Sequence, residues 1–276
     1  MLFGMRFVWV ICMVGVAAGY AHAEKRDYHA QPFRLAVAIG DSVTAGGTAL
    51  SPEQCWVSLL AGLINESQMK PVEIVNNGIG ANLISPRSTL YDKSQKPSAL
   101  ERYQEHVIAY RPDLVLIAYG LGDALAGSPL APFLEDLRHI VLDIKKQTGA
   151  VIVIVNACFM TAFDRHEPFN RASVASIEGS NAALKSLAEE CDVLYADVFS
   201  AQGMAPWTVD PVDGVHPNNL GHRLIANRVF ETLAQNCSGL SERTLELRKT
   251  FKPWRPTREK QIQREFFEKR HEKEKK

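Results

Sequence analysis

The stretch RLAVAIGDSVTAG, residues 34–46, decides how this chain is expected to fold. Its apolar run at 34–39 is continuous rather than alternating, which predicts a strand buried on both faces. Gly40 permits a sharp turn at the end of that strand. We expect Ser42 to begin the next helix, where free backbone amides and the helix dipole favour an alcohol nucleophile developing negative charge. The alternative is that Asp41 and Ser42 serve only as a helix cap.

Similar apolar runs recur along the chain, at 72–76, 113–119, 151–156 and 193–197. Segments with helical spacing of apolar residues lie around 56–64, 103–110, 134–144, 173–190 and 218–235. This alternation predicts an α/β fold, a three-layer α/β/α sandwich around a five-stranded parallel sheet. Ligands bind such sheets at the carboxyl ends of the strands, so functional residues should directly follow the strands.

A second motif, DGVHPN at residues 213–218, follows the fifth predicted strand. His216 can accept the proton of Ser42, and Asp213 can orient the imidazole from three residues away. Alone, such a motif is most often a capped turn. Its place on the same predicted face as Ser42 favours catalysis.

Together, GDS at 40–42 and DGVHPN at 213–218 resemble the SGNH (GDSL-like) hydrolase superfamily, over roughly residues 33–235. The resemblance implies a flavodoxin-like fold, with Ser42 as nucleophile, His216 as base and Asp213 as its orienting partner. It implies neither a metal nor an organic cofactor. The G-x-S-x-G elbow of other hydrolases is absent from this sequence.

The resemblance also implies an oxyanion hole, formed by Ser42, Gly80, Ala81 and Gly122. The family block N-x-G-x-x-G reads NNGIGAN here, at 76–82. Its second glycine, whose amide lines the hole, is either replaced by Ala81 or shifted to Gly80. A backbone N–H survives either change.

Gly122 is the main departure from the family, because the block G-x-N-D reads GLGD at 120–123. The family asparagine donates its side-chain amide to the oxyanion. Loss of one such donor costs about 2.7–4 kcal/mol of transition-state stabilisation. Three outcomes are open: Asn82 or Asn156 supplies the donor, two backbone amides suffice, or the chain binds a ligand and turns over poorly.

Several further residues near the predicted strand ends are candidates for substrate binding: Asp41, Asn82, Asp123 and His166. His166 lies with Arg165 and Phe169 in the long loop after the fourth strand, and all three are candidates to contact substrate. The alternative is that this segment is an ordinary exposed loop. We expect His139 and His222, each within a helix, to be surface or packing residues.

Residues 1–23 have the pattern of a signal peptide, with Arg6, an apolar run at 7–18 and a small-residue site ending at Ala23. The run is shorter than the ~20 apolar residues of a membrane anchor, which is the alternative. We expect cleavage after Ala23 and a secreted or periplasmic protein. Export permits disulfides, and Cys191–Cys237 is the first pairing to consider among four mature cysteines; the alternative is free thiols.

The body, residues 24–240, is predicted to be the hydrolase domain, and residues 241–276 a charged, basic tail. In 242–276, 13 Lys/Arg face 7 Asp/Glu, so the tail is basic and the body acidic. An acidic body argues against nucleic acid as its substrate. The tail is either a solvated helix or disordered, and an anionic surface is its candidate partner.

These features predict hydrolysis of a carboxylic ester through an acyl-enzyme on Ser42. Export and the resemblance favour a small-molecule or glycan ester, with O-acetyl groups on a carbohydrate as the first candidate. A lipid ester or thioester is the rival substrate. A carbohydrate-binding protein with weak turnover is the alternative outside enzymes, and Gly122 is its main support.

Overall fold

The computed structural model describes residues 25–252 and 258–274, so the predicted signal peptide lies outside the described residues. Parallel strands form a five-stranded sheet in the order β2-β1-β3-β4-β5. In chain order the strands are β1 Leu35–Gly40, β2 Glu73–Gly78, β3 Leu114–Ala118, β4 Val151–Val155 and β5 Leu194–Ala196. This is the flavodoxin-like order, which confirms the predicted fold.

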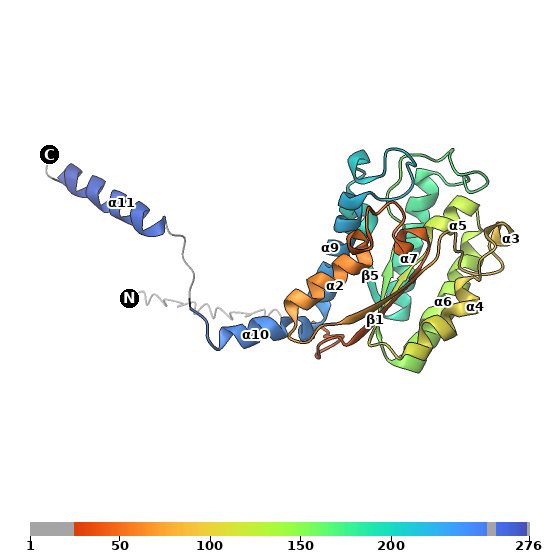
Figure 1. The fold of residues 1–276 in the computed structure, drawn as a ribbon, viewed down its shortest axis with the longest axis horizontal. Coiled ribbons are helices and arrows are strands. Elements are labelled where there is room, and N and C mark those ends of the chain that lie inside the picture. Colours follow the sequence, from red (N-terminus) through yellow and green to blue (C-terminus); the bar gives the residue numbers. More distant parts are fainter. Residues whose placement is uncertain (1–24, 253–257, 275–276) are drawn as a thin grey trace, which may run out of the picture.

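Long helices cover both faces of this sheet (Figure 1). Two of them, α2 Trp56–Ser67 and α9 Asn219–Asn236, pack on one face with Ala36 and Ala38 of β1. On the other face, α4 Ala99–His106, α6 Leu130–Thr148 and the second half of α7 Val174–Cys191 pack with Val37 and Ile39. Side chains of a strand alternate between faces, so a continuous apolar run supplies both cores.

Shorter helices complete the chain: α1 Ser42–Ala45, α3 Tyr91–Ser94, α5 Leu121–Ala126, α8 Val198–Gln202, α10 Glu242–Arg248 and the longer α11 Glu259–Glu274. Single 3₁₀ turns lie at Pro52–Gln54, Ile108–Tyr110, Pro206–Thr208 and Ser238–Ser241. No helix in the described ranges is long and apolar enough to cross a membrane.

The second strand differs from its prediction as a strand buried on both faces. In β2 every residue is exposed or only partly buried, because β2 is an edge strand with β1 as its only neighbour in the sheet. Its polar residues Asn76 and Asn77 fit that position.

The predicted disulfide Cys191–Cys237 is wrong, since the four described cysteines are free and buried. Cys191 packs in the core on the α6 face of the sheet, and Cys237 in the core on the α9 face. The two thiols therefore lie in different layers of the protein. Burial raises the pKa of Cys237 to about 12, so this thiol stays protonated.

The predicted tail contains the helices α10 and α11. Glu242 of α10 accepts a hydrogen bond from the backbone N–H of Met69 at 2.8 Å, which ties α10 to the end of α2. Figure 1 shows α11 beyond α10 and away from the sheet. Its larger apolar side chains Ile262, Phe266 and Phe267 are exposed.

Candidate active site

The turn after β1 places Ser42 at the carboxyl edge of the sheet. A Cβ on Gly40 would come within 2.6 Å of the Ala118 carbonyl oxygen, so only glycine fits where β1 passes β3. Asp41 caps α1, because its Oδ1 accepts the Val43 N–H at 3.0 Å. Ser42 is therefore the first residue of α1, where the helix provides no carbonyl partner for its amide.

The three predicted catalytic side chains form one hydrogen-bonded chain. His216 Nε2 lies 2.7 Å from Ser42 Oγ, across 174 positions of sequence. His216 Nδ1 lies 2.6 Å from Asp213 Oδ2. All three are partly buried. This is the geometry by which an imidazole removes a serine proton while a carboxylate fixes its orientation.

The DGVHPN loop holds Asp213 ready as an ionised partner. Its Oδ1 accepts the backbone N–H groups of Val215 at 2.8 Å and His216 at 3.0 Å. Burial acts to raise the pKa of Asp213, but these amides and the imidazole outweigh it, so the pKa is lowered. Gly214 has φ +71°, and a Cβ there would meet Cβ of Ala162 at 2.5 Å. The loop is thus locked against the segment after β4.

A pocket of about 260 Å³ opens beside the Ser42 hydroxyl. Among its walls are the predicted site residues Asp41, Ser42, Ala81, Gly122, His166 and His216. Sequence reasoning had not assigned its apolar walls Leu121, Leu125 and Val215 to the site. Phe169, predicted together with Arg165 and His166 as a substrate contact, also lines it. The pocket therefore combines a polar end at Ser42 with apolar sides.

Ala81, rather than Gly80, lies at the pocket. Its φ is +54°, in the left-handed region that favours glycine. Ala81 thus has a backbone conformation that glycine adopts most easily, and glycine is the residue that the resemblance leads us to expect at this position. Gly80 has open space where a Cβ would be and does not line the pocket.

The segment around Gly122 is packed too closely for a larger residue. A Cβ on Gly122 would lie 2.9 Å from the backbone oxygen of Asn82. The N–H of Gly122 points to Asp41 Oδ2 at 3.4 Å. The Asn82 carbonyl therefore occupies part of the space that a side chain at 122 would need.

Two predicted substrate contacts, Asn82 and Asp123, support the protein instead. Asn82 is fully buried, donates to the Pro97 carbonyl at 2.6 Å and accepts from Tyr119. Asp123 accepts the Ile84 N–H at 3.1 Å and the Ser88 hydroxyl at 2.6 Å. Both side chains hold the loop after β2 and do not line the pocket, so their prediction as substrate ligands is wrong.

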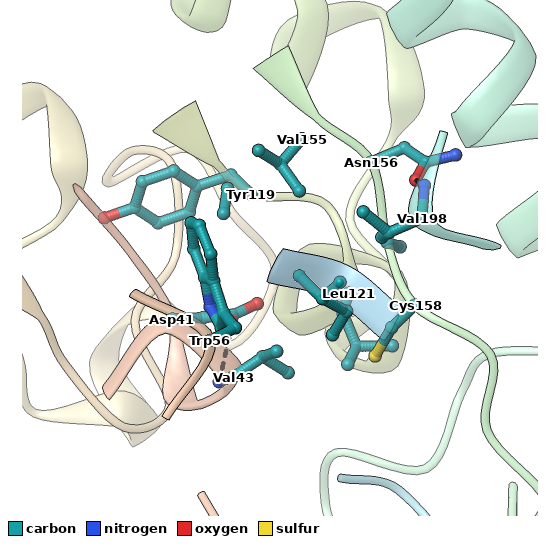
Figure 2. A pocket seen from close by; sticks show the side chains of 12 residues that line it. Asp41, Val43, Trp56, Tyr119, Leu121, Val155, Asn156, Cys158 and Val198 are labelled. Carbon is teal, nitrogen blue, oxygen red and sulfur yellow. Dashed lines mark hydrogen bonds between the residues drawn. The ribbon is translucent and has the colours of Figure 1, made fainter. Parts of the chain in front are cut away.

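Asn156 does not replace the missing oxyanion donor either. Its amide group donates to Tyr195 at 2.8 Å and to Asp197 at 2.9 Å. Its oxygen accepts the Val198 N–H at 2.8 Å. It lines a small internal cavity of about 20 Å³ behind Asp41 (Figure 2), together with the fully buried Trp56.

His166 lies at the pocket, next to the catalytic loop. Its Nε2 is 3.3 Å from the Asp213 carbonyl oxygen, and its ring meets that of His216 edge-on at 6.3 Å. Arg165 donates to the Val212 carbonyl on the same loop.

The other two histidines considered, His222 and His139, are a packing and a surface residue, as predicted. His222 is fully buried, and burial lowers its pKa. His139 contacts the Tyr103 hydroxyl at 3.3 Å.

One buried residue near the site escaped the sequence analysis. Arg102 in α4 is 2% exposed and donates to groups at the ends of β1, β2 and β3. In the sequence, the only sign of this residue is a charge beside the apolar stripe of α4.

In the part of the chain that the structure describes, no cluster of three His, Cys, Asp or Glu residues could hold a metal.

The sheet order and the Ser–His–Asp chain at its carboxyl edge define an α/β/α protein of the serine-hydrolase type. The sequence pattern of the GDSL-like Lipase/Acylhydrolase family matches residues 38–224, and the chain belongs to this family. It is a hydrolase of carboxylic esters, as expected from the resemblance to the SGNH superfamily.

Similar proteins include an acetylxylan esterase of Geobacillus stearothermophilus, 27% identical over 212 residues, which cover 68% of this chain and 88% of that protein. The solved structure of an acetylxylan esterase from that organism superposes with a TM-score of 0.55 at 24% identity, covering 72% and 94% of the two chains. It has also been solved as catalytic mutants at a serine, an aspartate and a histidine. A lipase/acylhydrolase of Enterococcus faecalis superposes with a TM-score of 0.56 at 18% identity, covering 81% and 100%.

Proposed function

We propose that this protein is an exported serine esterase that removes short acyl groups, acetyl first among them, from a carbohydrate. The observation that carries the proposal is the chain from Ser42 through His216 to Asp213, with links of 2.7 and 2.6 Å. The catalytic serine, aspartate and histidine of the acetylxylan esterase support the same roles here.

In the first step Ser42 Oγ attacks the ester carbonyl and its proton passes to His216 Nε2. The tetrahedral intermediate then collapses, the C–O bond to the alcohol breaks, and His216 returns the proton to the leaving alcohol. Water repeats the sequence on the acyl-enzyme, releases the acid and restores Ser42. Asp213 remains ionised throughout and stabilises the imidazolium.

The amides of Ser42 and Ala81 are the proposed donors to the oxyanion. Gly122 contributes no side-chain donor, and its own N–H faces Asp41. Asn82 and Asn156 are buried, do not line the pocket, and donate to the Pro97 carbonyl and to Tyr195 and Asp197, so neither replaces it. We therefore propose catalysis with two backbone donors, which suits an activated or small ester better than a demanding one.

The decisive test compares Ser42→Ala with the wild type on p-nitrophenyl acetate and on acetylated xylo-oligosaccharides. We expect the variant to lose hydrolysis by at least about 1,000-fold, because the nucleophile is gone. A fluorophosphonate should label the wild type at Ser42 only. Unchanged turnover in the variant would refute the assignment, and an unreactive Ser42 would favour the carbohydrate-binding alternative.

A lipid ester or thioester is the second candidate, favoured by the apolar pocket walls Leu121, Leu125, Phe169 and Val215. p-Nitrophenyl esters of two to twelve carbons separate the two candidates. The carbohydrate-acetyl proposal expects kcat/KM to fall beyond about four carbons. A maximum at eight or more would transfer the proposal to acyl lipids.

A further inference from the structure

Arg102 makes five hydrogen bonds from a position that is 2% exposed. Its Nη2 donates to the Tyr119 hydroxyl at 2.7 Å, to Asn82 Oδ1 at 2.9 Å and to the Gly40 carbonyl at 3.3 Å. Its Nη1 donates to the Asn77 carbonyl at 2.8 Å and its Nε to Asn82 Oδ1 at 3.2 Å. One planar guanidinium thus joins the carboxyl ends of three different strands.

These partners are all neutral. No carboxylate forms an ion pair with Arg102 within residues 25–252 and 258–274. Burying a cation that lacks a counter-ion is costly. An all-apolar core residue would avoid that cost, so packing alone does not explain an arginine here.

The partners of Arg102 flank both proposed oxyanion donors. Gly40 lies two residues before Ser42, and Asn82 directly follows Ala81. The Ala81 segment has a left-handed residue at its tip and is exposed there. Its backbone is held by the Ile79 N–H on the Gly40 carbonyl at 3.1 Å and the Asn82 N–H on the Ile79 carbonyl at 3.2 Å, and Arg102 adds the side-chain link between the same two segments. The missing side chain at Gly122 leaves the hole dependent on these two amides.

We propose that Arg102 is a positioning residue for the oxyanion hole. It fixes the turn of Ser42 and the loop of Ala81 relative to each other through its hydrogen bonds to the Gly40 carbonyl and to Asn82 Oδ1. This inference rests on the proposed function and deepens it. A misplacement of about 1 Å in a reacting group can cost about 100-fold in rate.

The test measures kcat and KM for p-nitrophenyl acetate in Arg102→Lys and Arg102→Gln, with active sites counted by fluorophosphonate titration. We expect kcat to fall about 10-fold in Arg102→Lys and about 100-fold in Arg102→Gln, with KM changed less than about threefold. Because kcat is then calculated per active site, a smaller fraction of folded protein does not lower it. A merely structural role of Arg102 would therefore leave kcat unchanged.

Arg87→Lys is the matched control. Arg87 also makes several hydrogen bonds, to Asp136 at 2.6 and 3.0 Å and to the Pro132 carbonyl at 3.0 Å. It does not line the pocket. We expect its loss to lower stability and leave kcat per active site unchanged.

If neither Arg102 variant folds, Asn82→Ala removes the acceptor that links Arg102 to the Ala81 loop and should also lower kcat. Folded Arg102 variants, or a folded Asn82→Ala variant, that keep kcat within twofold would overturn the positioning role. An inactive Ser42→Ala beside fully active Arg102 variants would overturn this inference alone. An active Ser42→Ala would instead overturn the proposed function.

Discussion

At the scale of single residues, two positions differ from the family pattern that the sequence was compared with. Ala81, where that pattern has glycine, has a φ of +54°, in the left-handed region that favours glycine. At position 122, where that pattern has asparagine, the Asn82 carbonyl oxygen would lie 2.9 Å from a Cβ on Gly122. The two changes are neighbours in space, since Asn82 follows Ala81 directly. We infer that the loop after β2 sits closer to α5 than an asparagine at 122 would allow.

Restoring the family residue at position 122 should therefore fail to improve the enzyme. Gly122→Asn and its control Gly122→Ala both add a Cβ against a backbone oxygen, so the Ala81 loop must move. We expect both to lose kcat/KM on p-nitrophenyl acetate, and about 1–3 kcal/mol of unfolding free energy. A rate gain in Gly122→Asn but not in Gly122→Ala would show instead that the missing donor limits catalysis.

The buried carboxyl of Asp123 should make stability depend on pH. Burial is the main cause that raises its pKa to about 7, from an ordinary value of 3.8. The folded state therefore binds this proton more tightly than the unfolded state does. The stabilisation is complete below about pH 4 and is lost as pH rises towards 7, by at most ~1.4 kcal/mol per pH unit.

Urea unfolding of the wild type and Asp123→Asn between about pH 4 and 8 measures this effect. The asparagine cannot ionise, so the variant should gain stability relative to the wild type as pH rises. A constant difference across that range would mean that Asp123 titrates near its ordinary pKa.

At the scale of elements, the site depends on how helices begin after strands and loops. Asn218 caps α9 by accepting the N–H groups of Leu220 at 3.0 Å and Gly221 at 3.1 Å. Its amide also donates to the carbonyls of Trp207 at 2.8 Å and Val209 at 3.1 Å. One side chain thus ends the catalytic loop, starts the helix and anchors the preceding 3₁₀ turn.

Asn218→Ala should lower both stability and activity. Loss of a helix N-cap costs about 0.5–2 kcal/mol, and His216 loses the anchor two residues after it, so kcat/KM should fall as well. Ser173→Ala is the control. The Ser173 hydroxyl caps α7 by accepting the Ser176 N–H at 3.1 Å, and Ser173 does not line the pocket. This substitution should lower the melting temperature alone; equal losses of activity in both variants would contradict a special role for Asn218.

At the scale of the whole molecule, the proposed catalytic residues lie at the sheet, and α11, the second helix of the tail, lies away from it (Figure 1). Residues 253–276 contain nine Lys/Arg and five Asp/Glu, whereas the body is acidic. Within α11 the five basic residues are matched by five acidic ones, so the net positive charge of this segment lies at its two ends.

Deleting residues 253–276 should leave kcat/KM on p-nitrophenyl acetate within about twofold of the wild type, because α10 remains packed on α2. At low salt, the shortened protein should bind vesicles of anionic phospholipid more weakly than the wild type does. The difference should shrink as salt is added, since surface charge attraction is screened over about 10 Å at 0.1 M salt. Vesicle binding that survives the deletion would assign it to another surface, and a loss of esterase activity would show that the tail supports the fold.

Much of this protein could be predicted from short stretches of its sequence. The continuous apolar run at 34–39 and its counterparts at 113–119, 151–156 and 193–197 predict parallel strands, because burial on both faces demands that pattern. Ser42 directly follows β1, and Asp213 and His216 lie on the loop that leads from β5, through α8 and a 3₁₀ turn, to α9. Parallel strands end at one edge of a sheet, so these segments return to the same edge. The fold and the meeting of these three residues were therefore readable from local patterns and their order.

Tertiary structure alone decided which groups fill the space around that edge. Arg102 meets the Gly40 carbonyl across 62 positions of sequence, and no local pattern encodes such a partner. Asn82 and Asp123 turn inward for the same reason, and Cys191 and Cys237 fall on opposite faces of the sheet. A strand or helix follows from the periodicity of neighbouring residues, but hydrogen-bond partners follow from how distant segments pack.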